Sequence, residues 1–461
     1  MDQGFYKFLG LVALGLFGVA VFFERFTLIA FLVISALLLS VIVDRKNGFG
    51  PFFIVLAALS PLSFGLVIFQ SAKIVVPIEY LIIVIAPVVL LRYYRQSFAL
   101  LKKYPWPALW ILSFLPALFY SEMLAVSVKY LILNSLYVLV FYYGLLDWRD
   151  NGGKYSNLII AFGLGLVVVL IYGFINYASY DYNPITVSGL YKPFFYSHTY
   201  LGACLAFLAA FTWGKIKVAP WYLLAAIFFS LATLFTSSRA ALWSLVVMAA
   251  FVLLLQLGPK ARWIIPLLLI SGGLGFGGLQ KIEEVFTYNQ YHSHDPNATL
   301  VENSMSVTNV QTDVSNIERL NRWVSALKMF VERPHSGFGP GTYQFTYIPF
   351  QEKELENRLT VKNPDYPPEG SGGTAHSELL LQLSENGWPS LLLFLVIVGR
   401  WFYFGFWPEV EKREILIPLF LGLITYFFHM NFNNFLNQPA GAFLFWSFGA
   451  ILEHSSKTNQ T

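Results

Sequence analysis

The sequence predicts an all-α polytopic membrane protein with about 12–14 transmembrane helices and one large external loop that contains an amphipathic helix. The chain of 461 residues is 56% hydrophobic and only 12% charged, whereas soluble domains carry roughly 25% charged residues. Long apolar runs approach the roughly 20 residues that a spanning helix needs; four of them lie at 9–23, 26–43, 74–91 and 242–257. A single hydrophilic segment, 281–375, interrupts this pattern.

Hydropathy divides the chain into three parts: spans 1–11 within 1–280, the external loop at 281–375, and spans 12–14 with a short tail within 376–461. The fourteen candidate spans have the limits 8–23, 26–43, 51–69, 74–91, 106–120, 124–146, 157–178, 196–213, 220–236, 239–257, 263–280, 377–405, 414–430 and 438–453. The third and fifth are the weakest runs. Each contains a proline, Pro61 or Pro116, which predicts a kink.

The basic residues give the orientation. Loops after even-numbered spans carry most of them, including Arg45, Lys46, Arg92, Arg95, Lys102, Lys103, Lys215, Lys217, Lys260 and Arg262. Short loops after odd-numbered spans carry only Arg25, Lys73, Lys192 and Arg239. Because positively charged loops stay in the cytoplasm, we expect both termini there and 281–375 on the other side.

The external loop begins with a stretch rich in Asn, Ser, Thr and His that predicts irregular structure. Capping residues at 315–318 then start a helix that should stop at Arg333-Pro334. Its apolar residues recur at helical spacing: Leu320, Trp323, Val324, Leu327 and Phe330. We expect this apolar face to lie on the membrane or on the bundle of spans. A glycine-rich turn follows at 337–341.

Two groups of arginines belong to the external side. Arg239 lies at the outer end of two apolar runs, where it either anchors the interface or faces an anionic ligand. Arg319 and Arg322 lie on the amphipathic helix. A solvated polar face is the alternative for this pair, but the planar guanidinium fork also matches phosphate oxygens.

His376 follows a flexible Gly-Ser-Gly-Gly stretch at the entry to the twelfth span, directly before Ser377 and Glu378. Histidine is suited to moving a proton near neutral pH. Its other interpretation is a capping or interfacial residue. Because Arg239 and the external loop are separated by two spans, they lie on the same side of the membrane. Two arginines suited to a diphosphate and a histidine suited to general-base catalysis could therefore meet there.

Four segments together resemble the O-antigen ligase/polymerase family, in the order that the family has them. They are 236–242 (TSSRAAL), 319–330 (RLNRWVSALKMF), 334–343 (PHSGFGPGTY) and 376–387 (HSELLLQLSENG). The resemblance covers roughly 185–400. It implies a glycosyltransferase of the bacterial inner membrane that needs no metal and no other cofactor. Its donor would be a glycan on undecaprenyl diphosphate, and its chemistry an inverting displacement on the periplasmic face.

Carried over by position, Arg239 and Arg319 match the arginines that engage the donor diphosphate, and His376 matches the proposed base on the acceptor hydroxyl. We expect further substrate contacts from a second group: Arg322, His198, Glu378 and Asn433. Ligation to lipid A–core, as in lipopolysaccharide biosynthesis, is the leading expectation. A span count nearer that of polymerases keeps O-antigen polymerisation open, and protein O-glycosylation is a third possibility.

A transporter of lipid-linked substrates is the competing class. It predicts repeated halves and charges near the midplane, but the sequence has no internal repeat and few such charges. Glu79 and Lys129 fall inside predicted spans and are expected to form a structural pair. The loose spacing of His292, His294 and Asp295 argues against a metal site. Membrane lipids are expected partners and nucleic acids are not.

Overall fold

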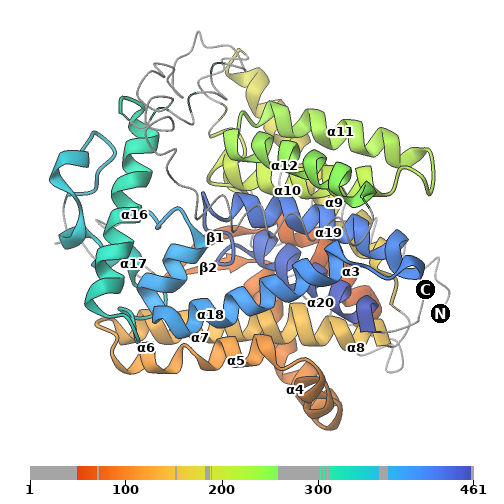
Figure 1. The fold of residues 1–461 in the computed structure, drawn as a ribbon, viewed down its shortest axis with the longest axis horizontal. Helices are drawn as coiled ribbons and strands as arrows, with labels where there is room; N and C mark the ends of the chain where they lie inside the picture. The colour runs from red at the N-terminus through yellow and green to blue at the C-terminus, as the bar shows by residue number, and fades with distance from the viewer. Residues whose placement is uncertain are drawn as a thin grey trace.

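The computed structural model describes 49–69, 72–150, 153–181, 187, 189–257, 302, 306, 309, 311–362 and 372–457. Three predicted spans, 8–23, 26–43 and 263–280, lie outside the described residues, as does the tract with His292, His294 and Asp295. Figure 1 shows α19 and α20 in the middle of the molecule, with α10, α11 and α12 on one side and α5, α7 and α8 on the other.

Helices dominate the described part of the chain, and four of its helical segments are long and apolar enough to cross a membrane. These segments are Leu124–Asp150, Tyr155–Ser179, Arg239–Gln256 and Glu378–Phe406. The first runs without interruption through α7 (Leu124–Tyr137), a π-helical segment (Val138–Gly144) and α8 (Leu145–Asp150). The other three are α9, α12 and α18. The predicted class, an all-α polytopic membrane protein, is thus confirmed.

The remaining helices are shorter or carry more charge. They are α3 (Phe49–Leu59), α4 (Ile78–Lys103), α5 (Trp106–Leu112), α6 (Leu115–Phe119), α10 (His198–Gly214), α11 (Trp221–Phe235), α16 (Val314–Glu332), α17 (Tyr343–Thr346), α19 (Arg413–His429) and α20 (Pro439–Lys457). Short 3₁₀ turns lie at Ser60–Leu62, Ile348–Phe350, Lys353–Leu355 and Val410–Lys412. The fifth predicted span is two helices, α5 and α6, that meet just before Pro116.

The third predicted span, 51–69, is wrong. Helix α3 ends at Leu59, and after the 3₁₀ turn the chain forms β1 (Phe64–Phe69), which pairs antiparallel with β2 (Ala72–Val76). Pro61 cannot donate a helical hydrogen bond, and the Ser60 hydroxyl donates to the carbonyl of Leu56 at 2.7 Å. The following Val and Ile residues favour a strand. Hydropathy alone could not separate this apolar hairpin from a helix.

Helix α10 packs closely against both α11 and α19. Its side chains from Leu201 to Thr212 are all buried, and many of them are alanines. Small residues let helix backbones approach one another. A Cβ on Gly202 would lie 2.9 Å from the Thr236 hydroxyl and 3.1 Å from the Cβ of Ala241. This close approach fixes the start of α12, and with it Arg239, beside α10.

Helix α16 is confirmed, with the Asp313 carboxylate as its N-cap, accepting from the backbone N–H of Asn316 at 3.0 Å. Its orientation was only partly predicted. Of the apolar stripe, Trp323 meets the ring of Phe432, whereas Leu327 is 47% exposed. The buried face is largely polar: Asn316, Glu318, Asn321, Arg322, Ser325, Ala326 and Met329. The helix therefore turns its charged groups toward the protein.

Candidate functional site

Arg239 is the first residue of α12, directly after the capping Ser238, whose side chain accepts from the backbone N–H of Ala241. Its guanidinium donates to the Ser306 hydroxyl at 2.7 Å and to the Asn316 side-chain oxygen at 3.2 Å. Asp313 lies 3.9 Å away. With only 10% of its side chain exposed, Arg239 faces the external segment and is not an exposed interfacial anchor.

Arg319, two turns along α16 from its N-cap, lies at the centre of the charged groups. Burial and the neighbouring Arg239 lower its pKa to about 10, and Arg322 acts in the same direction, while the Asp313 carboxylate opposes them. The guanidinium remains charged at neutral pH. Its Nε is buried and has no hydrogen-bond partner among the described residues. An anion would supply both the missing acceptor and the missing negative charge.

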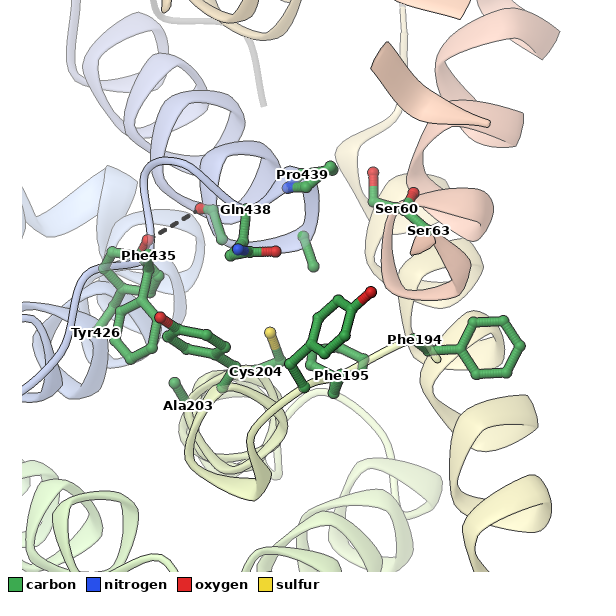
Figure 2. A pocket seen from close by; sticks show the side chains of 14 residues that line it. Ser60, Ser63, Phe194, Phe195, Ala203, Cys204, Tyr426, Phe435, Gln438 and Pro439 are labelled. Atoms are coloured by element: carbon green, nitrogen blue, oxygen red, sulfur yellow. Dashed lines mark hydrogen bonds between the residues drawn. The ribbon is translucent and has the colours of Figure 1, made fainter. Parts of the chain in front are cut away.

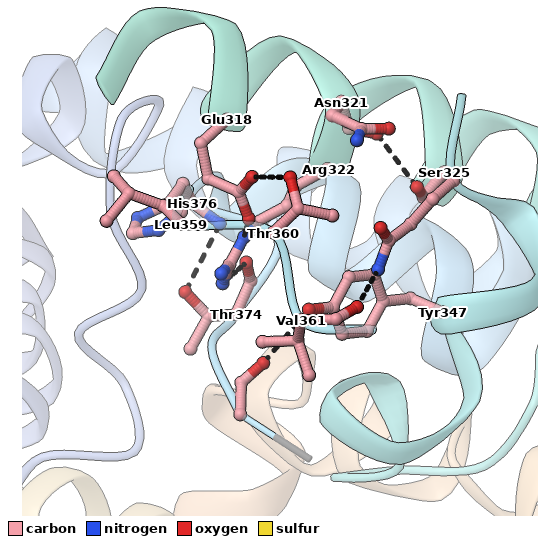
Figure 3. A network of polar contacts seen from close by, with 12 residues as sticks. Glu318, Asn321, Arg322, Ser325, Tyr347, Leu359, Thr360, Val361, Thr374 and His376 are labelled. Atoms are coloured by element: carbon pink, nitrogen blue, oxygen red, sulfur yellow. Dashed lines mark hydrogen bonds and ion pairs between the residues drawn. The ribbon is translucent and has the colours of Figure 1, made fainter. Parts of the chain in front are cut away.

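Arg322 is held inside the protein. Its Nε donates to the Glu318 carboxylate at 2.6 Å and its Nη1 donates to the carbonyl of Thr374 at 3.2 Å (Figure 3). A Cβ on Gly373 would lie 1.5 Å from the guanidinium, so only glycine leaves room for it. The solvated alternative is thus wrong for Arg322. These contacts fix the segment that carries His376.

His376 has a left-handed backbone conformation, with φ of 50°, and its N–H donates to the Thr374 hydroxyl at 3.2 Å. Burial lowers the pKa of its imidazole well below the usual range, and Arg322 and Arg319 lower it further, whereas a hydrogen bond to the Asn433 side chain raises it. The ring is therefore neutral at pH 7. Its Nδ1 is buried and lacks a partner within the described residues. A neutral imidazole can accept a proton.

Glu378 joins the start of α18 to the loop between α19 and α20. Its backbone N–H donates to the carbonyl of Met430 at 2.8 Å, and its carboxylate accepts from the N–H of Phe435 at 3.2 Å. The side chain is fully buried. This loop also supplies Asn433, whereas His198 is the first residue of α10. The structure thus gives Glu378 a holding role; its predicted substrate contact remains a prediction.

The glycine-rich turn replaces part of the backbone hydrogen bonding of α18. That helix is kinked at Gly387, with φ of 75°, and Pro389 has no N–H to offer to the carbonyl of Glu385. Instead the turn donates: Phe338 N–H to the Ser384 carbonyl at 3.1 Å, and Gly339 N–H to the Glu385 carbonyl at 2.9 Å. In return, the N–H of Trp388 donates to the carbonyl of Pro334 at 2.9 Å.

The side chain of Glu385 strengthens this junction, a role that was not predicted. Its two carboxylate oxygens accept from the backbone N–H groups of Gly341 and Tyr343, each at 2.9 Å. Side chains at two glycines are excluded, because a Cβ on Gly337 or Gly387 would lie within 2.6 Å of backbone atoms across the junction. The sequence signal was a glycine and a proline inside an apolar helix, but the partner segment could not be identified from it.

A small cavity lies beside the loop that joins α19 to α20, between the first turns of α10 and α20 and the end of α3 (Figure 2). Its lining is mainly aromatic, with Ser60, Ser63 and Gln438 among the polar groups. The cavity has a volume of about 20 Å³, which is room for a water molecule and far too little for a sugar. Within the described residues, no group of three or more His, Cys, Asp or Glu side chains could hold a metal ion.

These features describe a polytopic membrane protein in which buried arginines lie beside a buried histidine. Residues 223–395 match the family model of the O-antigen ligase domain. This match supports the O-antigen ligase-like family for the chain, and the matched range includes Arg239, Arg319 and His376. No curated protein matches the chain. The match supports glycan transfer in general, from a lipid-linked glycan to an acceptor, by a glycosyltransferase-like enzyme.

Proposed function

We propose that the protein transfers a glycan from undecaprenyl diphosphate to a hydroxyl of lipid A–core, on the periplasmic face of the bacterial inner membrane. The observation that carries this proposal is the placing of Arg319. Its charge exceeds what Asp313 compensates, and it lies near both Arg239 and His376. The arginines are suited to bind a diphosphate, and the neutral histidine is suited to take a proton from a hydroxyl nucleophile.

In the proposed reaction, the acceptor oxygen attacks the anomeric carbon of the first sugar. Its proton passes to the neutral imidazole of His376, and the bond between the anomeric carbon and the diphosphate oxygen breaks with inversion. Negative charge then grows on the departing undecaprenyl diphosphate. Fixed positive groups stabilise such charge because they need no reorganisation during the reaction.

The two arginines contribute differently. Arg239 already donates to Ser306 and Asn316 and lies near Asp313, so it has less capacity left for a ligand. Arg319 has an unpartnered Nε and is therefore the principal diphosphate ligand. The contacts of Arg322 with Glu318 and Thr374 make it a positioning residue that holds the segment of His376.

The basic residues at 215–217 and 400–413 support an orientation that keeps those loops in the cytoplasm. The start of α12, the start of α18 and helix α16 then lie together at the periplasmic end. This arrangement lets a membrane-anchored donor and a membrane-anchored acceptor meet at one surface. Figure 1 shows α16 and α17 at one end of the helical bundle, beside the start of α18.

The test uses the full-length protein in lipid nanodiscs with undecaprenyl-diphosphate glycan and lipid A–core, followed by mass analysis. Glycan on lipid A–core, with free undecaprenyl diphosphate, is the expected result. Longer glycan that is still bound to undecaprenyl diphosphate would instead identify a polymerase, and transfer to a protein hydroxyl would identify a protein O-oligosaccharyltransferase. Movement of intact donor across the bilayer without bond cleavage would contradict transfer and favour a transporter.

A further inference from the structure

His429, the last residue of α19, is fully buried, yet neither ring nitrogen has a hydrogen-bond partner among the described residues. The ring packs on Phe435, with 4.9 Å between the ring centres. A buried polar group without a partner destabilises the folded state. Such a residue is therefore a sign of a missing ligand or water molecule.

The surroundings of His429 connect it to the site. Arg319 and His198 are its nearest charged or ionisable neighbours. Asn433, four residues further along, is buried and contacts His376, and its Nδ2 lacks a partner within the described part of the chain. Arg319, His376, His429 and Asn433, each with an unpartnered atom among the described residues, thus lie on neighbouring side chains from α16, the start of α18, and the end of α19 with the loop after it.

The chemistry of these atoms separates two ligand groups. The guanidinium of Arg319 offers only donors, which suit phosphate oxygens. The imidazole of His429, in its neutral form, offers one donor and one acceptor. An ionised diphosphate has no proton to donate to that acceptor nitrogen, whereas a sugar hydroxyl both donates and accepts.

We propose that His429 and Asn433 form a sugar subsite, which binds hydroxyl groups of the glycan next to the reacting carbon while Arg319 binds the diphosphate. This inference rests on the proposed function. The hydroxyl groups belong either to the donor glycan or to the acceptor core. Both sources have the same chemistry, and the experiment below separates them.

Hydrogen bonds connect the proposed subsite to the segment that carries His376. The loop that follows His429 is fixed to the start of α18 by the two hydrogen bonds of Glu378, one to Met430 and one from Phe435. Glu378 is two residues from His376. A sugar held by His429 and Asn433 would therefore keep a constant position relative to the imidazole of His376.

The experiment measures ligand-induced thermal stabilisation of the full-length protein in nanodiscs. Two ligand pairs are compared: undecaprenyl-diphosphate glycan with undecaprenyl diphosphate, and lipid A–core with lipid A. In the wild type, the glycan-bearing member of one pair, either undecaprenyl-diphosphate glycan or lipid A–core, should stabilise the protein more than the member without the glycan or the core. That pair identifies the source of the hydroxyl groups. His429→Phe should remove the difference and weaken binding of the glycan-bearing ligand about tenfold, an effect of one lost hydrogen bond.

The phenylalanine variant retains the packing on Phe435, so without ligand it should be as stable as the wild type or more stable. His429→Gln retains a donor and an acceptor and should recover part of the affinity; it also serves if His429→Phe fails to fold. His454→Phe is the matched control, because His454 is a buried histidine with a partner, Asp150 at 2.6 Å. This control should lose stability but keep the ligand difference.

Two results are distinguishable. If wild type transfers glycan and His429→Phe binds and transfers equally well, the sugar subsite is wrong and an ordered water molecule satisfies His429. If wild type neither binds nor transfers either substrate pair, the proposed function itself is wrong.

Discussion

Two buried polar clusters lie at opposite ends of the last helices, and their hydrogen bonding differs. At the C-terminal end of α20, the Glu453 carboxylate accepts from the Tyr142 hydroxyl and from Arg400, each at 2.7 Å. It also accepts from the Trp401 ring N–H at 3.3 Å and lies 3.1 Å from the Lys457 ammonium. The Glu453 carboxylate is thus fully matched by donors. At the other end, Arg319, His376 and His429 each retain a nitrogen that has no partner among the residues the structure describes.

Both clusters are buried, so burial alone does not separate structure from function. A matched cluster satisfies its own charges and joins helices. An unmatched one leaves charge and hydrogen-bonding capacity for something else, at a cost in stability. Unpartnered buried atoms occur in both clusters, Arg400 Nε among them, so the difference lies in charge: Arg400 and Lys457 pair with Glu453, whereas Arg319 has Arg239 and Arg322 as neighbours. The following predictions test that difference in order of decreasing effect.

His376→Ala should reduce glycan transfer by a factor of roughly 10³ or more, because proton transfer loses its base. The unfolding temperature should change little, since Nδ1 of His376 has no partner among the described residues and the hydrogen bond with Asn433 is the side-chain bond that is lost. Product mass analysis and thermal unfolding are measured on the same preparation. Full activity in the folded variant would remove His376 from the mechanism.

Arg319→Gln should lower kcat/KM by a factor of roughly 10²–10³, the usual effect of removing one group that stabilises a developing negative charge. Arg239→Gln should have a smaller effect, because its contacts to Ser306 and Asn316 are internal. Arg333→Gln is a matched control: this half-buried arginine pairs with Glu122 and with none of the site residues. Equal loss in all three variants would contradict the assigned roles.

Glu453→Ala should lower the free energy of unfolding by about 3 kcal/mol, the effect of breaking a buried ion pair. Transfer per folded molecule should be unchanged, because the residue lies roughly 20 Å along α20 from the site loop. Chemical denaturation and kinetics are compared on one sample. A variant that loses activity while retaining stability would show that the matched cluster is not purely structural.

The pH dependence should reflect His376. The reactive form is the neutral imidazole, and its lowered pKa should keep kcat/KM constant to below pH 6.5, with the acidic limb beneath that value. Arg322→Gln removes a positive neighbour, so the pKa should rise and the acidic limb should shift to higher pH by less than about one unit. An unchanged profile in this variant would show that Arg322 does not act on His376.

The sequence was sufficient for the class of fold and for most of the helices. Long apolar segments such as 157–178 correspond closely to α9, and the proline after α16 predicted its end, whereas its N-cap is Asp313 and not the predicted 315–318. It failed at 51–69, because an apolar hairpin and an apolar helix have the same hydropathy. The Glu79–Lys129 pair was partly anticipated: Glu79 also accepts from the Val75 N–H at 2.8 Å and lies near Lys129.

For the site, the motifs identified Arg319 and His376 but not what holds them. The contact that holds the His376 segment, from Arg322 to the carbonyl of Thr374, joins residues 52 apart in the chain. No local pattern specifies such pairs. The burial of the polar face of α16 could likewise not be predicted from the sequence, because periodicity shows that a helix has two faces but not which face packs against the protein.

The exchanged hydrogen bonds between the glycine-rich turn and α18 bear on how the protein is made. When α18 enters the bilayer, the carbonyls of Ser384 and Glu385 lack the partners that an unbroken helix would give them, and hydrocarbon offers no replacement. The turn at Phe338 and Gly339 precedes α18 in the chain, so it is synthesised first and is available when that helix is inserted. Biogenesis would then bring His376 into place in the same step that completes the membrane helix.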